Sequence, residues 1–125
     1  MAQDRPTAAE LVEAVREFLE HDVMPIEGRV GFHGRVARNV LAILERELAA
    51  GEALDAAERA RIVDLLGVEA GSLETVDMER ELARRIRDGS LDDRRDEVVA
   101  AVRETVMGKL SVSNPAYIKG SGRTE

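Results

Sequence analysis

Apolar residues recur every three or four positions along most of this 125-residue chain, which is the spacing of one face of an α-helix. Glycine or proline residues interrupt the pattern several times. The interruptions leave five candidate helices, at residues 7–24, 30–50, 55–67, 72–89 and 93–112. No stretch alternates convincingly between apolar and polar residues, as a half-buried strand would. The sequence therefore predicts an all-α fold, a compact bundle of about five helices.

Local signals set the ends of these helices. Thr7–Glu10 matches a capping box, and Asp55–Glu58 repeats the pattern with Asp in the first position. Gly51 is predicted to end the second helix as a C-terminal cap. Gly67 closes the third helix in the same way. Asn114–Pro115 prevents the fifth helix from continuing.

Composition bounds the class of protein. The chain forms one domain, assigned to residues 1–119, with a disordered tail at residues 120–125. It has no cysteine, which rules out disulfides and thiolate metal sites within it. No apolar run is long enough for a membrane span, and the polar start is unlike a secretory signal, so a cytoplasmic protein is expected. The net charge of −7 and the scarcity of aromatic residues argue against binding to nucleic acid.

Charged or polar side chains occupy positions inside the predicted apolar stripes. They are Asp22, His33, Glu47, Arg59, Glu79 and Lys109. A rotation of about 100° per residue places each of them among the apolar residues of its own helix. Because buried polar groups need partners, these residues mark either a functional site or structural pairs within the core.

Asp22 and His33 form the first candidate pair. A short connection joins their helices, so we expect the two side chains to lie close together. A carboxylate that accepts the ring N–H would fix the imidazole tautomer, and His33 could then act as a general base or a metal ligand. A satisfied structural pair is the simpler interpretation. His21 could complete a metal cluster, but the spacing of known zinc motifs is absent, and we predict no metal and no cofactor.

Two further pairs follow from the same pattern. Glu47 and Arg59 flank Gly51, and an ion pair between them would join the second and third helices and fix their register. Lys109 lies near the C-terminal end of the fifth helix, where a cation interacts favourably with the helix dipole. Alternatively, its aliphatic chain could lie along apolar surface while its ammonium group reaches water. Glu79 on the fourth helix is its candidate partner. For all four residues a structural role is the favoured interpretation.

Arginines cluster around the end of the fourth helix. They are Arg84, Arg85, Arg87, Arg94 and Arg95. Such a cluster could hold a phosphate-bearing ligand, because arginine offers a bidentate fork. In a site built on His33 and Asp22, Arg85 or Lys109 could hold an anionic group. A solvated face that pairs with neighbouring carboxylates is the favoured alternative. The chain has no glycine-rich phosphate loop and no serine nucleophile elbow, so no familiar motif supports catalysis.

Several longer segments resemble a bacterial family of short helical proteins known only as a domain of unknown function. The segments are RPTAAEL at residues 5–11, FHGRVARNVL at 32–41, ELARRIRDG at 81–89 and KLSVSNPAY at 109–117. The resemblance draws attention to Asn39 and Arg85, whereas Ser113 and Glu79 depart from the family pattern. Genes of this family often lie beside those of aminoglycoside-phosphotransferase-like kinases and acyl-CoA dehydrogenases. The resemblance therefore implies an accessory role.

The candidate polar site comprises eight residues in all. They are Asp22, His33, Asn39, Glu47, Arg59, Glu79, Arg85 and Lys109. The first hypothesis is a non-catalytic helical accessory or interaction protein for a phosphotransferase-like or acyl-CoA-processing enzyme, with a contact surface near Arg35, Arg38 and Asn39. Self-association into a homo-oligomer is also open to such a bundle. The alternative is a small ligand- or metal-binding domain or enzyme that uses Asp22 and His33. A helix-turn-helix regulator is the weakest hypothesis, because the chain is acidic.

Overall fold

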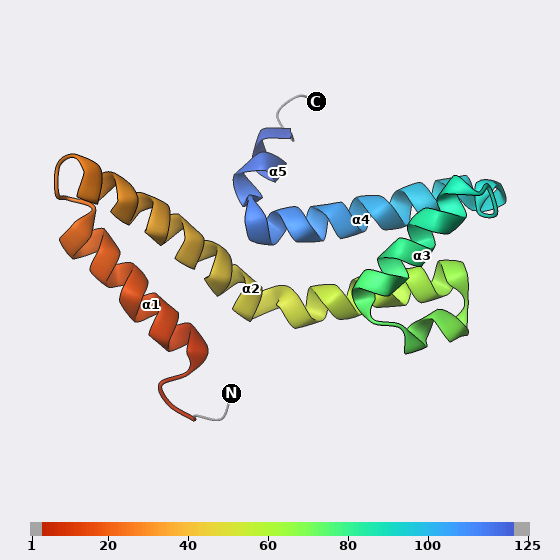
Figure 1. Ribbon diagram of the computed structural model, residues 1–125, viewed down its shortest axis with the longest axis horizontal. Coiled ribbons are helices and arrows are strands. Elements are labelled where there is room, and N and C mark those ends of the chain that lie inside the picture. Colours follow the sequence, from red (N-terminus) through yellow and green to blue (C-terminus); the bar gives the residue numbers. More distant parts are fainter. Residues whose placement is uncertain (1–3, 122–125) are drawn as a thin grey trace.

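The computed structural model describes residues 4–121, and within them helices and short turns account for the whole chain (Figure 1). Five α-helices are present: α1 (Ala8–Phe18), α2 (Arg29–Leu66), α3 (Thr75–Arg87), α4 (Arg95–Ser113) and α5 (Pro115–Ser121). Three shorter helical turns adjoin them, at Leu19–Val23, Val68–Ser72 and Asp92–Arg94. The predicted all-α class with about five helices is confirmed.

Helix α1 begins as the sequence predicts. The Oγ1 atom of Thr7 accepts a hydrogen bond from the backbone N–H of Glu10 at 3.1 Å, and the Glu10 carboxylate accepts one from the backbone N–H of Thr7 at 3.0 Å. These bonds satisfy N–H groups that the first helical turn leaves without partners. A π turn at Leu19–Val23 continues the helix. The chain then reverses through Gly28, whose φ of 87° favours glycine.

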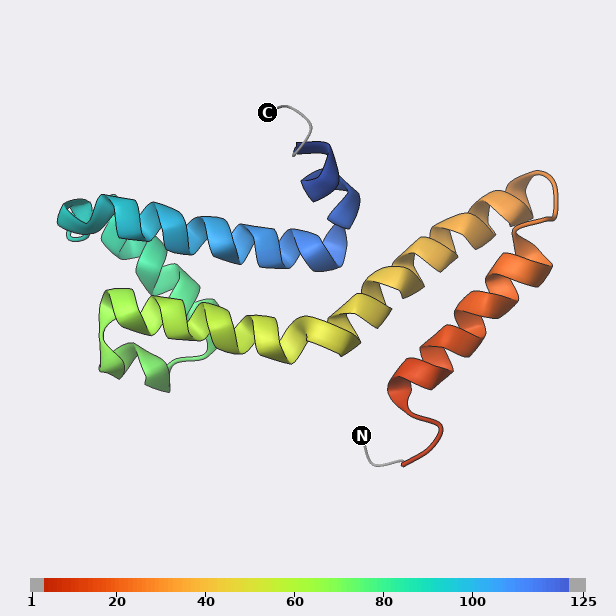
Figure 2. The same ribbon diagram turned by 180° about the vertical axis from the view of Figure 1, so that it is seen from behind.

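Helix α2 differs most from the sequence prediction. It runs without interruption for 38 residues, so the predicted second and third helices are one helix and Gly51 is not a C-terminal cap. A capping glycine takes a positive φ, and Gly51 does not. Glycine inside a helix costs only about 1 kcal/mol relative to alanine. The flanking alanines and leucines are strong helix formers, so the helix continues through Gly51. Figures 1 and 2 show that α2 instead bends near its middle.

The bend divides the described chain into two parts. We call α1, the π turn and residues 29–50 of α2 the N-terminal hairpin, because α1 runs antiparallel to this half of α2 (Figures 1 and 2). The remainder of α2 packs with α3 and α4, and we call this part the C-terminal bundle. The hairpin stands away from α3 and α5 in both views.

Buried apolar side chains are confined to the C-terminal bundle. The core cluster consists of Ile62, Leu65, Ala70, Met78, Leu82, Leu91 and Val98. In the N-terminal hairpin no residue of α1 is buried, and residues 29–50 of α2 bury only Gly31 and Gly34. The Gly34 backbone lies so close to Val23 that a Cβ atom would approach the valine side chain at 2.6 Å. The two helices of the hairpin therefore pack closely, with half-buried side chains between them and no fully buried apolar side chain.

The C-terminal end of the chain contains one helix that the sequence analysis left out. Helix α4 stops before Asn114, as predicted, and Pro115 then opens α5, where its fixed φ suits a first helical position. Gly120 and Ser121 belong to α5, and the rest of the predicted tail, residues 122–125, lies outside the described residues. In the described part of the chain no helix is long and apolar enough to cross a membrane.

Candidate functional site

Three ionisable side chains meet in the C-terminal bundle, one from each of its helices. Glu58 of α2, Glu79 of α3 and Lys109 of α4 form what we call the Glu58 cluster. The Nζ atom of Lys109 lies 2.6 Å from Oε2 of Glu79, and Glu79 shares a hydrogen bond with Glu58. Glu58 stands four residues before Ile62 on the core-facing side of α2, and it is only 7% exposed. The helical repeat therefore places this carboxyl group at the edge of the core.

Burial determines the protonation of the cluster. Loss of solvent is the largest cause that raises the pKa of Glu58, followed by the hydrogen bond and charge of Glu79; with the opposing charge of Lys109 included, the pKa reaches about 7. The pKa of Glu79 moves the other way, because its carboxylate accepts hydrogen bonds from Glu58 and Lys109. Glu79 in turn raises the pKa of Lys109. Below about pH 7 the two carboxyl groups therefore share one proton, which resides mainly on Glu58, and this proton is lost as the pH rises through 7.

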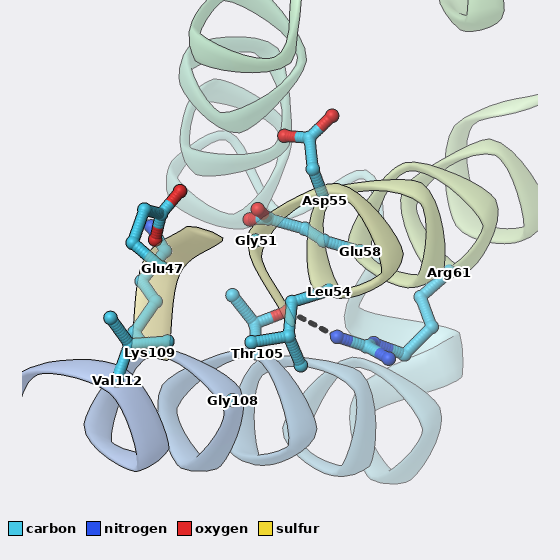
Figure 3. A pocket seen from close by; sticks show the side chains of 10 residues that line it. All are labelled: Glu47, Gly51, Leu54, Asp55, Glu58, Arg61, Thr105, Gly108, Lys109 and Val112. Carbon is cyan, nitrogen blue, oxygen red and sulfur yellow. Dashed lines mark hydrogen bonds between the residues drawn. The ribbon is translucent and has the colours of Figure 1, made fainter. Parts of the chain in front are cut away.

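Two cavities adjoin the Glu58 cluster. One, of about 280 Å³, lies between α2, α3 and α4 and has mostly apolar walls that include Leu82 and Val106. The other, of about 200 Å³, lies between α2 and α4, and Figure 3 shows the side chains that line it. Drug-sized ligands occupy pockets of roughly 300–1,000 Å³. These cavities are smaller and would admit only a ligand of a few heavy atoms.

Arg61 reaches into both cavities from α2. Its Nη2 atom donates a hydrogen bond to Oγ1 of Thr105 at 3.1 Å, which joins α2 to α4 (Figure 3). Its Nε atom is buried and has no hydrogen-bond partner. A buried N–H donor without a partner is uncommon. Arg61 and Glu58 both line the two cavities.

Two of the three members of the Glu58 cluster, Glu79 and Lys109, were predicted from the sequence. The predicted pairing of Lys109 with Glu79 is confirmed by their ion pair. Glu58 was missed because it was assigned to a capping box with Asp55, and no helix begins there. Its spacing of four from Ile62 and seven from Leu65 was the available signal.

Asp22 and His33 do not form the predicted pair. Both side chains are exposed, and among residues 4–121 no hydrogen bond joins them. The Nε2 atom of His33 instead accepts a hydrogen bond from Nε of Arg29 at 3.3 Å, and its ring meets the Phe32 ring edge-on with centroids 5.6 Å apart. His33 does lie within the apolar stripe of its helix, as predicted. This part of the stripe, however, faces solvent and not a core.

Glu47 and Arg59 do not form the predicted ion pair either. Because α2 is continuous, the two residues lie twelve positions apart on one helix, or roughly 18 Å along its axis. Arg59 instead donates hydrogen bonds to Oγ1 of Thr75 at 3.0 Å and to the carbonyl oxygen of Gly71 at 3.1 Å. It thereby ties α2 to the start of α3. Glu47 is exposed and lines the smaller cavity at the same end as Lys109 (Figure 3).

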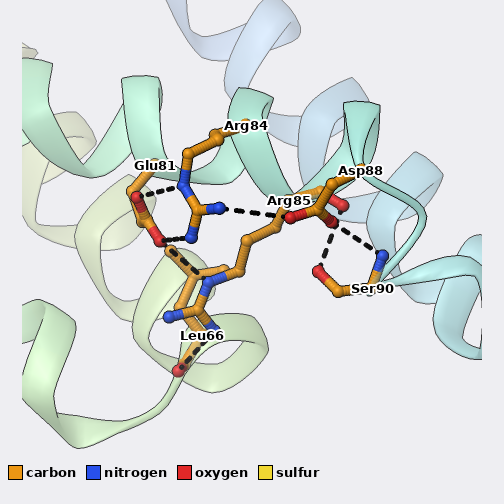
Figure 4. Close-up of polar contacts among 6 residues, drawn as sticks. All are labelled: Leu66, Glu81, Arg84, Arg85, Asp88 and Ser90. Atoms are coloured by element: carbon orange, nitrogen blue, oxygen red, sulfur yellow. Dashed lines mark hydrogen bonds and ion pairs between the residues drawn. The ribbon is translucent and has the colours of Figure 1, made fainter.

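Arg85 acts as a cap within the bundle. Its Nη1 atom donates to the carbonyl oxygen of Leu66, the last residue of α2, at 3.3 Å, and its Nε atom pairs with Glu81 at 3.0 Å (Figure 4). Arg84 pairs with Glu81 and Asp88 in the same network. The favoured interpretation, a charged face paired with neighbouring carboxylates, describes this part of the arginine cluster. Helix ends need such donors, because the last four carbonyl groups have no partner within the helix.

A second arginine caps the same end of α2, and a third caps the end of α4. Nη1 of Arg94 donates to the carbonyl oxygens of Asp64 and Leu65, both at 3.2 Å. Nε of Arg46 donates to the carbonyl oxygen of Val112 at 2.7 Å and so links the middle of α2 to the end of α4. Asn39, the remaining candidate, is exposed and accepts a hydrogen bond from Nε of Arg38 at 3.0 Å.

The N-terminal hairpin carries a different kind of candidate site. We use the term hairpin face for its exposed apolar residues, which are Leu11, Val15, Phe18, Phe32, Val36, Val40, Ile43, Leu44 and Leu48. Their exposed fractions run from 37% to 58%. Every substantial contact of α1 is with α2 and the adjoining π turn. Contiguous apolar patches of this size on a folded protein usually mark an interaction site.

Across the described chain, residues 4–121, no group of three or more His, Cys, Asp or Glu side chains could hold a metal ion.

Comparison with known proteins places the chain in a family. It belongs to the family described as Domain of unknown function (DUF6285), whose pattern matches residues 25–117. No curated protein and no solved structure matches the chain. The matched segment includes all of α2, α3 and α4, and with them the Glu58 cluster and most of the hairpin face.

Proposed function

We propose that this chain is a non-catalytic helical accessory protein that acts in the cytoplasm by binding other protein chains through the hairpin face. The observation that carries the proposal is the exposure of that face. Nine apolar side chains, spaced as residues that a helix buries, remain 37–58% exposed on two adjacent helices. Leaving so much apolar surface in water is unfavourable by roughly 25 cal/mol per Å², so a partner that covers it gains that free energy.

The partner class comes from the family resemblance. We expect a phosphotransferase-like kinase or an acyl-CoA-processing enzyme that is encoded nearby. Protein interfaces combine an apolar centre with a polar rim. Asn39 supports this arrangement, because it directly precedes Val40 and lies exposed beside the apolar stripe of α2, with Arg38 as its hydrogen-bond partner.

The test is co-expression of this chain with the neighbouring enzyme, followed by native mass spectrometry of the purified material. We expect a stable complex that contains both proteins. The variant Val40→Asp places a charge in the centre of the hairpin face and should abolish the complex. Val99→Asp in α4 is the matched control, because Val99 is 57% exposed and Val40 is 58% exposed. Two separate species with the unaltered chain, at micromolar concentrations, would contradict the proposal.

A second candidate function is the binding of a small polar ligand at the Glu58 cluster. The buried carboxyl group of Glu58, the unpartnered Nε of Arg61 and the two adjoining cavities favour it. Butyrate and butylammonium are suitable probes, because each has an apolar chain that fits the cavity walls and one charged end. Resonances of Leu82 and Val106 should shift on titration with one probe, and the shift should be lost in Glu58→Gln. If neither probe shifts these resonances, the cavities do not bind such ligands.

A further inference from the structure

The chain exposes far more surface than a folded monomer of its size. Its accessible surface is 9118 Å² for a mass of 13.7 kDa. Folded monomers of this mass expose roughly 6,600 Å². Even fully extended, the seven residues outside the described range would add only about 1,100 Å², less than half of the excess. The excess is on the order of the area that obligate dimers bury.

Half of the exposed large apolar side chains, ten of the twenty in the described part of the chain, lie on the N-terminal hairpin. The hairpin consists of two helices, α1 has no substantial contact beyond α2 and the π turn, and the only buried residues of the hairpin are two glycines. Two antiparallel helices can each bury one narrow strip against the other. A wider apolar stripe remains in water unless another layer covers it.

The exposed stripes of the two helices lie on the same side of the hairpin. On α1 the half-buried residues that turn toward α2 are Val12, Arg16 and Leu19, and Arg16 pairs there with Glu45. The exposed residues stand one position earlier: Leu11, Val15 and Phe18. On α2, Val40 and Leu44 likewise stand one position before the half-buried Leu41 and Glu45. One position is a rotation of about 100° in the same sense on both helices. Because the helices are antiparallel, equal rotations lead to one common face.

We propose that a second copy of this chain covers the hairpin face, so that two hairpins pack as an antiparallel four-helix bundle. The inference rests on the proposed function, because both assign the hairpin face as a protein-binding surface. Here the partner on that face is a second copy of the chain. A second hairpin has the same length and an equally wide apolar stripe, and it completes the usual number of helices in such a bundle. Two-fold symmetry lets the same patch serve both copies.

Two polar residues on the hairpin face indicate how the copies align. Val23 and Gly34 face each other within the hairpin, and Asp22 and His33 stand one position before them. An acid in the π turn and a base on α2 therefore lie exposed at the same level of the same side of the hairpin. With the two-fold axis parallel to the helices, α1 of one copy lies on α2 of the other. Asp22 then meets the second copy's His33, and the contact occurs twice. The pair that is absent within one chain forms between two chains.

The first experiment measures the mass of the purified full chain by light scattering and sedimentation at micromolar concentrations. We expect the mass of two chains. Val40→Asp should raise the dimer dissociation constant roughly thirty-fold or more, as expected for a charge introduced into an interface hot spot. The control Val99→Asp should remain dimeric. Equal far-ultraviolet circular dichroism of the two variants excludes loss of folding. The mass of one chain for the unaltered protein, or equal dimerisation of both variants, would overturn the proposal.

A second experiment tests the alignment and uses the absence of cysteine from the chain. The single variants Asp22→Cys and His33→Cys are prepared separately, mixed and oxidised. Any disulfide between the two variants joins different chains by construction. We expect the mixed species to exceed either dimer of identical variants, because a disulfide requires Cα atoms about 4.4–6.8 Å apart. Predominant linkage between identical variants would overturn the placement of α1 on the second copy's α2.

The two proposals that use the hairpin face can fail separately. A chain that is monomeric alone but forms a Val40-dependent complex with the neighbouring enzyme would overturn the dimer and support the accessory role. A dimer that never associates with the enzyme would support self-association and contradict the choice of the enzyme as partner. A dimer that also binds the enzyme would support self-association and the accessory role, and would overturn the choice of the hairpin face as the enzyme's binding surface.

Discussion

Lys109 on α4 and Glu79 on α3 lie 2.6 Å apart, Nζ to Oε2, beside the buried carboxyl group of Glu58 on α2. This ion pair does more than join two surface side chains, because Glu79 also accepts the proton-bearing hydrogen bond of Glu58. The charge of Lys109 thereby keeps one carboxylate ionised while its neighbour stays neutral. The protonation of the cluster links the packing of three helices to pH.

Glu58 should make the stability of the chain fall as the pH rises from 5 to 8. Its pKa is about 7 in the folded chain and near 4.5 when exposed, so the folded state binds the proton more tightly. For such a group the stabilisation is complete below the unfolded pKa and is lost as the pH passes the folded pKa. We expect a loss of at most about 3 kcal/mol in the free energy of unfolding, measured by urea denaturation at several pH values.

The variant Glu58→Gln isolates this contribution. Glutamine keeps the size and the hydrogen-bonding capacity but cannot ionise, so its stability should vary less between pH 5 and 8. Glu52→Gln, which changes an exposed acid on the same helix, should keep the pH dependence of the unaltered chain. If Glu58→Gln and the unaltered chain show the same slope, Glu58 does not titrate in this range.

Lys109→Met should destabilise the chain more at pH 8 than at pH 5. At the higher pH both carboxyl groups tend to ionise, and without the ammonium group their repulsion is uncompensated. Because Lys109 is 62% exposed, its direct ion pair is screened, and we expect a loss of about 1 kcal/mol at pH 8. A double-mutant cycle with Glu79→Gln, followed by urea denaturation, measures the coupling. Equal losses at the two pH values would indicate lost packing of the lysine stem and not lost charge.

Helix ends with a local chemical signature could be predicted from the sequence. Thr7 supplies a hydroxyl for the first turn, and Asn114–Pro115 stops α4, and both signals depend only on near neighbours. The predicted helix end at Gly51 was wrong, because glycine permits a C-terminal cap but does not require one. Whether it ends the helix depends on the residues that pack around it, which periodicity does not reveal. The same error concealed Glu58, since it created a false helix start at Asp55.

Gly51→Ala tests the continuity of α2 directly. Within a helix this change should stabilise the chain by about 0.5–1 kcal/mol, because alanine loses less backbone entropy on folding. The new Cβ would meet the carboxylate of Glu47, which is the far end of a flexible side chain and can move aside. Gly28→Ala serves as the contrast, because its φ of 87° strains any residue with a Cβ. Thermal denaturation compares the two, and destabilisation by Gly51→Ala would indicate that the helix does not run through this position.

The candidate pair Asp22 and His33 shows a second limit of periodicity. The sequence assigns both residues to apolar stripes, and these stripes exist on α1 and α2. What covers a stripe depends on tertiary and quaternary contacts that a helical wheel does not contain. In the C-terminal bundle the stripes of α2, α3 and α4 cover one another, whereas in the N-terminal hairpin one stripe of each helix has no cover within the chain.

Met78 and Phe18 separate folding from association. Met78 is completely buried in the C-terminal bundle, so Met78→Ala should lower the free energy of unfolding by about 2–5 kcal/mol through lost burial and a residual cavity. Phe18 is 54% exposed on the hairpin face, so Phe18→Ala should change the stability of the single chain by less than about 1 kcal/mol. It should nevertheless weaken self-association, since aromatic residues at the centre of an interface contribute strongly. Urea denaturation at low protein concentration measures the first effect and sedimentation the second. A large loss of single-chain stability in Phe18→Ala would show that the hairpin face is already covered within one chain.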